Sequence, residues 1–247
     1  MKVLCIVQAR MGSDRLPGKV IKKIIGKSII LHVLDRLSKA KLIDEIVLAT
    51  SDKKNEKPLI DLVENSHYNV FEGEEKNVLK RYKDAADRFK GDIIVRITGD
   101  CPCIDYLIVD NVISHFKMYD YDYVRLDVPN SFIRGFDVEV FSKKALDKVY
   151  RNICNLSNEE ELKDYKEHVT LYMYKHPNDF KIGIVKGEKQ YNKDYRLCVD
   201  TQEDFELVQN IYNNFNDEYV LAKDIVKYID DNNYLTNINS SVNQKNV

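Results

Sequence analysis

The sequence predicts an α/β fold with a mostly parallel sheet and a small antiparallel part, and three observations point to it. Short apolar runs alternate with segments in which apolar residues recur at helical spacing. Residues 3–50 read as strand, helix and strand, a unit whose right-handed crossover makes the two strands parallel. Glycines and charged residues follow the ends of several apolar runs, which is where open α/β sheets bind their ligands.

The first half of the chain supplies the parallel strands. Short runs rich in apolar residues are typical of strands buried on both faces, and they predict strands at 3–7, 45–50, 69–71 and 92–97. Apolar residues at helical spacing predict helices at 28–40, 58–65, 77–89 and 108–118. Ser28 stands at the start of the first helix and is a candidate N-cap.

The pattern changes beyond residue 120. Polar and apolar residues alternate at 121–124 and 136–141, as in antiparallel strands with one exposed face. Further strands are expected at 180–185 and 195–199, and helices at 143–151, 159–175, 202–215 and 222–231. The stretch 236–247 is rich in Asn and Ser without an apolar period, so we expect a disordered tail there.

Length and composition favour one domain that binds small molecules. The 247 residues are many for one domain and few for two, and no stretch rich in Pro, Gly and Ser separates two parts. We therefore expect a single domain over 1–235, with an antiparallel, dimerising and acceptor-side excursion at about 120–190. Lys and Arg total 38 against 40 Asp and Glu, which argues against a nucleic-acid or membrane partner.

The sequence suggests neither secretion nor a membrane location. Lys2 leads directly into strand-like residues, so no signal peptide is expected. No apolar run is long enough to span a bilayer. The five cysteines are scattered, and the spacing of Cys101 and Cys103 is not that of a common zinc or redox site. We therefore expect reduced thiols and a cytoplasmic protein.

The loop after the first apolar run is the first candidate site. It carries three cations and two glycines, which are Arg10, Arg15, Lys19, Gly12 and Gly18. This combination suits a polyanion, and our hypothesis is a nucleoside triphosphate. The loop resembles a Walker A run, but five residues separate its glycines where four are required, and Val20 replaces the magnesium-binding Ser or Thr. A Gly-x-Gly-x-x-Gly run is missing from this turn, which argues against a dinucleotide fold.

Asp100 and Asp200 form the second candidate site. Each follows an expected apolar strand, so both carboxylates are expected at the same edge of the sheet. Mg²⁺ is held in proteins by one or two carboxylates, with phosphate oxygens and water completing its shell. Two acids opposite a basic loop therefore suit phosphoryl or nucleotidyl transfer. Each acid taken alone has a simpler interpretation as a turn residue or a helix N-cap.

The charged turn 134–139 is a candidate contact for an acceptor. Arg134 suits a carboxylate or a phosphate, and Asp137 and Glu139 follow it along the alternating strand. A hairpin with cross-strand charge pairs explains the same residues equally well. His168 lies in an expected helix, where a hydrogen-bonded structural histidine is the default interpretation.

Several motifs follow one another in a recognisable order: Gln8-Ala-Arg-Met-Gly-Ser13, Arg15-Leu-Pro-Gly-Lys19, Ala49-Thr-Ser-Asp52, Val78-Leu-Lys-Arg-Tyr82, Arg96-Ile-Thr-Gly-Asp-Cys-Pro102, Arg134-Gly135, Asp137-Val-Glu139, Glu167-His-Val-Thr170, Val199-Asp-Thr201 and Glu203-Asp204. With them the chain resembles the CTP-dependent sugar-acid cytidylyltransferases, which include the enzymes that activate 3-deoxy-manno-octulosonate and acylneuraminate. The closest resemblance is to the subgroup of the spore coat polysaccharide biosynthesis protein SpsF, and it covers about residues 1–234.

The resemblance implies a nucleotide-diphospho-sugar transferase fold with a Rossmann-like α/β layer, Mg²⁺ as cofactor and a homodimer. The implied catalytic residues are Arg10, Lys19, Asp100 and Asp200, with both aspartates as metal ligands. The implied nucleotide contacts are Ala9, Arg10, Gly12, Ser13, Arg15, Lys19, Gly73, Arg81 and Asp100. The implied acceptor contacts are Arg134, Asp137, Glu139, His168 and Arg196.

The candidate sites and the resemblance together predict a cytidylyltransferase. An acceptor oxygen would attack the α-phosphorus of CTP and displace pyrophosphate, and the acceptor is expected to be an acidic sugar of the nonulosonic or ulosonic type for a surface glycan or polysaccharide. Two alternatives remain: a sugar phosphate or phosphonate as acceptor, or a non-catalytic nucleotide-binding paralogue. The intact Asp100 and Asp200 argue against the paralogue, because a binding protein has no need of two metal carboxylates.

Overall fold

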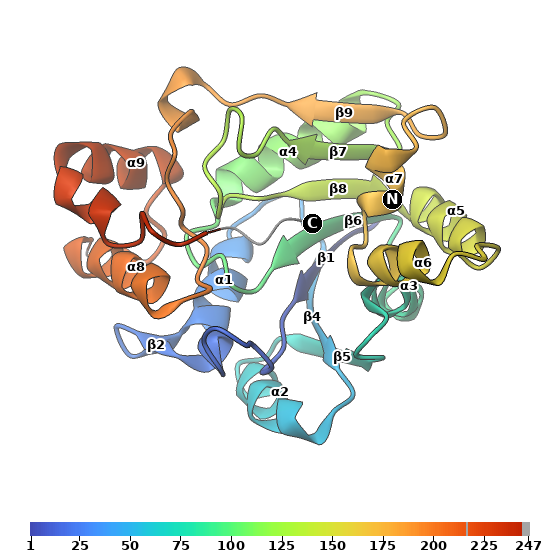
Figure 1. Ribbon diagram of the computed structural model, residues 1–247, viewed down its shortest axis with the longest axis horizontal. Helices are drawn as coiled ribbons and strands as arrows, with labels where there is room; N and C mark the ends of the chain where they lie inside the picture. The colour runs from blue at the N-terminus through green and yellow to red at the C-terminus, as the bar shows by residue number, and fades with distance from the viewer. Residues whose placement is uncertain (216, 244–247) are drawn as a thin grey trace.

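A seven-stranded sheet forms the centre of the computed structural model, which describes residues 1–215 and 217–243 (Figure 1). The strand order from one edge to the other is β5 (Asn69–Gly73), β4 (Glu45–Ser51), β1 (Val3–Gln8), β6 (Ile93–Thr98), β8 (Glu139–Ser142), β7 (Tyr123–Leu126) and β9 (Ile182–Val185). β1 pairs in parallel with β4 and β6, and β4 with β5. β8 is antiparallel to β6 and β7, while β9 is parallel to β7. The predicted fold class is confirmed.

Helices cover both faces of this sheet. On one face α1 (Ile29–Leu37), α2 (Lys57–Glu64) and α4 (Tyr106–Met118) share a buried cluster with Val3, Cys5 and Val7 of β1. The other face of β1, with Leu4 and Ile6, shares a cluster with α3 (Val78–Arg88), α5 (Lys143–Ile153), α6 (Glu159–Glu167) and α7 (Leu171–Lys175). Burial on both faces explains why β1 has no alternating polar residues.

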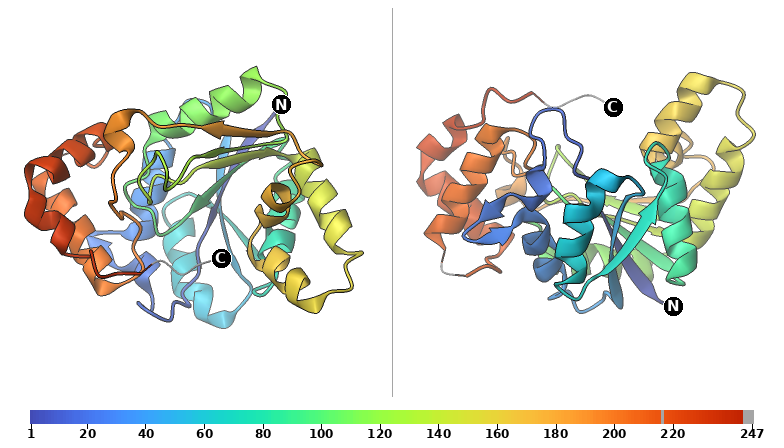
Figure 2. Two further views of the ribbon diagram at one scale, coloured as in Figure 1. Left: turned by 45° about the horizontal axis from the view of Figure 1, so that its top comes forward. Right: turned by 90° about the horizontal axis from the view of Figure 1, so that it is seen from below.

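A third cluster lies beside the sheet and holds the end of the chain. It joins α8 (Gln202–Asn214) and α9 (Ala222–Asp231) to Ile24 and Ile29, next to the small hairpin of β2 (Lys23–Ile24) and β3 (Lys27–Ser28). In Figure 1, α8 and α9 lie on the left and α5 and α6 on the right. Figure 2 shows the same separation from two further directions, with the loop that follows β1 between the two helical regions.

Short 3₁₀ helices connect these elements: η1 (Lys19–Ile21), η2 (Lys54–Glu56), η3 (Lys189–Tyr191) and η4 (Asn233–Asn237). In the described part of the chain, no helix has the length and apolar character needed to cross a membrane. The five cysteines are free thiols, and all but Cys154 are buried.

Three expectations from the sequence were wrong. The expected helix 159–175 is divided into α6 and α7, with His168 in an extended conformation between them. The segment 195–199 forms no strand and makes a single bridge, between Arg196 and Arg134. The expected disordered tail is folded over residues 236–243, where Asn239 is only 6% exposed, while 244–247 lie outside the described residues.

Candidate active site

The loop that follows β1 is closed on itself and tied to the end of β4. The Gly18 N–H donates to the Met11 carbonyl over 3.1 Å, and Gly18 has a φ of 65°, a left-handed conformation that favours glycine. The buried Glu56 carboxylate accepts from the Met11 N–H at 2.8 Å and from the hydroxyls of Thr50 and Ser51 at 3.1 Å. The loop is therefore held at both ends by hydrogen bonds within the protein.

The two aspartates predicted as metal ligands lie side by side. The Val199 N–H donates to the Asp100 carbonyl over 2.8 Å, and this bond brings residue 200 next to residue 100. The Lys19 Nζ lies 2.7 Å from a carboxylate oxygen of Asp100 and 2.7 Å from one of Asp200. The expected convergence of the two acids is therefore present, although only Asp100 follows a strand of the sheet.

Asp200 lies among three cations. Besides Lys19, Arg15 contacts its carboxylate at 2.9 Å, and Arg196 pairs with the same oxygen. Burial alone would raise the pKa of Asp200, but Lys19, Arg15 and Arg196 together hold that pKa below its ordinary value. Burial likewise lowers the pKa of Lys19, yet Asp100 and Asp200 raise it to a value above the ordinary one. Asp200 and Lys19 are therefore both charged at neutral pH.

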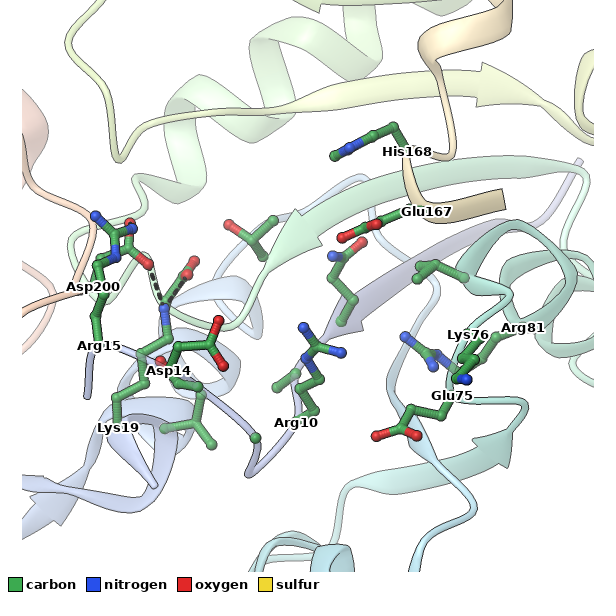
Figure 3. A pocket seen from close by; sticks show the side chains of 18 of the residues that line it. Arg10, Asp14, Arg15, Lys19, Glu75, Lys76, Arg81, Glu167, His168 and Asp200 are labelled. Atoms are coloured by element: carbon green, nitrogen blue, oxygen red, sulfur yellow. Dashed lines mark hydrogen bonds and ion pairs between the residues drawn. The ribbon is translucent and has the colours of Figure 1, made fainter. Parts of the chain in front are cut away.

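A cavity of about 910 Å³ opens beside this cluster. Figure 3 shows Arg15, Lys19 and Asp200 at one end of it, with Arg10 toward the middle. Glu75, Lys76 and Arg81 lie at the other end, and Glu167 and His168 form a further wall. The cavity is lined by ten of the residues predicted from the sequence, namely Ala9, Arg10, Gly12, Ser13, Arg15, Lys19, Arg81, Asp100, His168 and Asp200.

Two glycines predicted or implied at this site have different surroundings. Gly12 lines the cavity, and a Cβ added there would meet no described atom within 4 Å. Gly73 ends β5 outside the lining residues, and an added Cβ would lie 3.0 Å from the Cγ of Arg81. Gly73 therefore makes room for Arg81, whose guanidinium donates to the Glu74 carbonyl over 2.9 Å.

The other predicted acceptor contacts lie outside this cavity. Arg134 and Arg196 line a second cavity of about 430 Å³, which also contains the end of the described chain. Asp137 and Glu139 line a third and smaller cavity of about 120 Å³, which shares Arg96 with the first.

Glu139 is committed to contacts within the protein. Its carboxylate accepts hydrogen bonds from Arg96 and Tyr123, and from the Thr170 hydroxyl at 2.9 Å. Burial would raise the pKa of Glu139, but Arg96 and these hydroxyl donors keep it below its ordinary value. Asp137 differs, because burial raises its pKa although it accepts from the Gly135 N–H at 2.7 Å.

Sequence reasoning predicted Arg81 but missed Gln8 and Arg96 of the cavity wall. The Oε1 of Gln8 and the Nε atoms of Arg81 and Arg96 are buried without a hydrogen-bond partner in the described chain, and all three residues line the cavity. Buried polar atoms without partners are costly, so these three are suited to a polar ligand. The sequence did contain a signal for Arg96, because this residue is the one charge inside the apolar run 93–97.

The acid pair has the donor chemistry for a divalent cation. Its two carboxylates already share one positive charge, the ammonium group of Lys19. No group of three His, Cys, Asp or Glu side chains suited to a metal occurs within residues 1–215 and 217–243. Mg²⁺ binds by one or two carboxylates when phosphate oxygens supply further ligands, which matches this arrangement.

Comparison with known proteins identifies the family. The sequence profile of the family described as "Cytidylyltransferase" matches residues 4–233. The chain is 36% identical over 246 residues to an uncharacterized protein of Methanocaldococcus jannaschii, covering 99% of this chain and 97% of that one. It is 33% identical over 218 residues to the spore coat polysaccharide biosynthesis protein SpsF of Bacillus subtilis, covering 85% and 86%.

Two further comparisons agree. The chain is 38% identical over 127 residues to 3-deoxy-manno-octulosonate cytidylyltransferase 2 of Hydrogenovibrio crunogenus, covering 49% of this chain and 50% of that enzyme. The solved structure of a cytidylyltransferase from Leptospira borgpetersenii superposes with a TM-score of 0.88 at 30% identity, covering 100% of this chain and 99% of the other. The chain belongs to the cytidylyltransferase family.

Proposed function

We propose that the protein transfers CMP from CTP to a hydroxyl group of an acidic sugar, with release of pyrophosphate. One observation carries the proposal: Asp100 and Asp200 lie side by side around one cation at the end of a basic cavity. The names of the relatives support the substrates, since one relative acts on 3-deoxy-manno-octulosonate, a sugar acid, and another serves spore coat polysaccharide biosynthesis.

The basic loop is the proposed site of the triphosphate. Arg10 is exposed on the cavity wall, and Arg15 and Lys19 present cations at the end where the acids lie. In the reaction the acceptor hydroxyl gives up its proton to solvent as its oxygen bonds to the α-phosphorus, while the bond to pyrophosphate breaks and its electron pair leaves with that group. The cations neutralise the charge that develops on pyrophosphate, which is catalysis by positioning and electrostatics.

Asp100 and Asp200 are the proposed ligands of Mg²⁺. When bound, the metal supplies positive charge at the reacting phosphate. The two carboxylates would hold it, and Lys19, which now pairs with both acids, would then be available to the phosphates. Arg15 and Arg196 hold the Asp200 carboxylate in place.

The acceptor is proposed to bind where the first and third cavities meet. Arg96 lines both, and its buried Nε lacks a partner among the described residues, so it can donate to a carboxylate. His168 adds a polar side chain to the lining of the first cavity. The expected homodimer and the cytoplasmic location remain predictions.

Pyrophosphate release tests this function. The assay uses each of the four NTPs with Mg²⁺ and a panel of sugar acids, sugar phosphates and phosphonates. We expect release that requires CTP and a sugar acid. Preference for another base would refute the cytidylyl part, release with sugar phosphates alone would change the acceptor, and a lack of binding by every NTP would refute the role of the loop.

Substitution of Asp100 separates catalysis from folding. We expect Asp100→Asn to lower turnover roughly a hundredfold or more, because a group that stabilises transition-state charge is lost. Asp61→Asn is the matched control, since within the described part of the chain the Asp61 carboxylate pairs only with Lys57, on the exposed side of α2. Circular dichroism and thermal unfolding monitor the fold, and an unfolded Asp100→Asn protein would mark this acid as structural.

A further inference from the structure

The last described residues contact both halves of the candidate active site. After α9 the chain turns back past α8 (Figure 1). Asn239 is 6% exposed, and its Nδ2 donates to the Arg196 carbonyl at 2.9 Å and to the Asp204 carboxylate at 2.8 Å. Four residues later, the Asn243 carbonyl accepts from Arg15 of the first loop at 3.3 Å. The segment 236–243 thus contacts both Arg15 of the loop after β1 and the carboxylate of Asp204.

Asp204 connects Asn239 to the metal-binding acid. Its fully buried carboxylate accepts from the backbone N–H groups of Asp200 at 2.9 Å and Thr201 at 3.0 Å. The other oxygen accepts from the Arg196 Nε at 3.1 Å and from Asn239. Both carboxylate oxygens are therefore used, and one of them holds the backbone of Asp200.

Arg196 completes the connection. Its guanidinium pairs with Asp204 through Nε and with Asp200 through Nη2, while its own carbonyl accepts from Asn239. Without the Asn239 amide, a partly buried carbonyl and a buried carboxylate oxygen would each lose a donor. The ion pair of Arg196 and Asp204, which orients Asp200, would then be less well fixed.

We propose that Asn239 is a positioning residue for Asp200, so that the C-terminal segment 236–243 is a working part of the active site. This inference rests on the proposed function, because it assigns Asn239 to the binding of the metal with CTP. Asn239 acts through Arg196 and Asp204 and touches no substrate. Its loss lowers the metal-dependent part of nucleotide binding and leaves the metal-independent part, which the basic loop provides.

The test compares Asn239→Ala with Asn237→Ala. Asn237 has the same residue type in the same segment and is exposed, so it is a matched control. Mn²⁺ binding in the presence of CTP is followed by electron paramagnetic resonance, and CTP binding is measured with and without the metal. We expect Asn239→Ala to weaken Mn²⁺ binding roughly tenfold, the effect of one hydrogen bond to a charged group. CTP binding in EDTA should be unchanged, and Asn237→Ala should match the wild type.

The outcomes distinguish the positioning role of Asn239 from the proposed function on which it rests. If the wild type binds Mn²⁺ with CTP and Asn239→Ala binds equally well, the inference is wrong and the function stands, even where thermal stability falls. A wild type that binds neither ligand refutes both. If Asn239→Ala does not fold, hydrogen exchange of the wild type decides. Mn²⁺ with CTP should protect 196–204 and 236–243 together, and protection of 196–204 alone would refute the coupling.

Discussion

At the scale of single residues, Lys19 has the most informative position. Its ammonium group lies 2.7 Å from each of two carboxylates, and its side chain is 11% exposed. Among the described residues, Lys19 is thus the cation that pairs with both Asp100 and Asp200, while Arg15 and Arg196 pair with Asp200. Removing it leaves two partly buried acids to repel each other.

We predict that Lys19→Met destabilises the ligand-free protein by roughly 1–3 kcal/mol, because the acids lose their shared partner. Millimolar Mg²⁺ should then stabilise this variant more than the wild type, since a divalent cation replaces the ammonium group. Urea unfolding with and without Mg²⁺ measures both effects. Lys76→Met is the control, because Lys76 lines the same cavity without a described ion pair. Equal destabilisation of the two variants would contradict this account.

At the scale of elements, the central parallel strands β1 and β6 were predictable because each is largely buried on both faces and reads as an apolar run. The break after α6 was not predictable, because the chain has neither Pro nor Gly between 159 and 175. The turn accompanies a long-range bond from the Thr170 hydroxyl to Glu139. For 195–199, apolar residues indicated a strand, but the backbone N–H groups of Leu197 and Val199 donate to loop carbonyls instead.

Two helix caps allow a matched prediction at this scale. Asp105 caps α4 by accepting from Leu107 and Ile108, and it also accepts from the Ala222 N–H at the start of α9 at 2.6 Å. Asn158 caps α6 in the same way, but it is exposed and its side chain accepts no hydrogen bond beyond the cap among the described residues.

We predict that Asp105→Ala costs about 1 kcal/mol for the cap and a further 1–3 kcal/mol or so for the buried amide of Ala222. Asn158→Ala should cost about 1 kcal/mol or less. Urea unfolding of both variants makes the comparison. Similar losses would mean that the tie between α4 and α9 contributes little to stability.

At the scale of the whole molecule, the site combines predictable and unpredictable parts. Asp100 and the basic loop follow neighbouring parallel strands, so topology alone brings them to one edge of the sheet. The contribution of Asn239 was not predictable, since an Asn-rich stretch without apolar period lacks a local signal for folding. Its order comes from contacts with Arg196 and Asp204, far away in the sequence. The partnerless atoms of Gln8 and Arg96 likewise become visible only once the chain is folded.

Buried ionisable groups also set how the stability of the whole molecule depends on pH. His32 is buried in α1, with its Nε2 2.9 Å from the Ile24 carbonyl and its ring against Tyr212. Burial lowers the pKa of His32 from its ordinary value of 6.5, and the nearby charges of Lys27 and Arg36 lower it further. Glu218 and the bond to Ile24 act in the opposite direction without reversing the shift. The folded protein therefore keeps His32 neutral where the unfolded chain is protonated.

We predict that the free energy of unfolding falls in two stages as the pH is lowered. Below a pH of about 6.5, His32 is protonated in the unfolded chain but stays neutral in the folded protein. The free energy of unfolding therefore falls by up to about 1.4 kcal/mol per pH unit. Glu139 and Asp200 have folded pKa values below their ordinary 4.5 and 3.8, so their contributions are present above those values and are lost as the pH falls further. Urea unfolding at a series of pH values measures the curve. His32→Gln should flatten the first stage and leave the second, because glutamine does not titrate, and an unchanged first stage would assign it to another group.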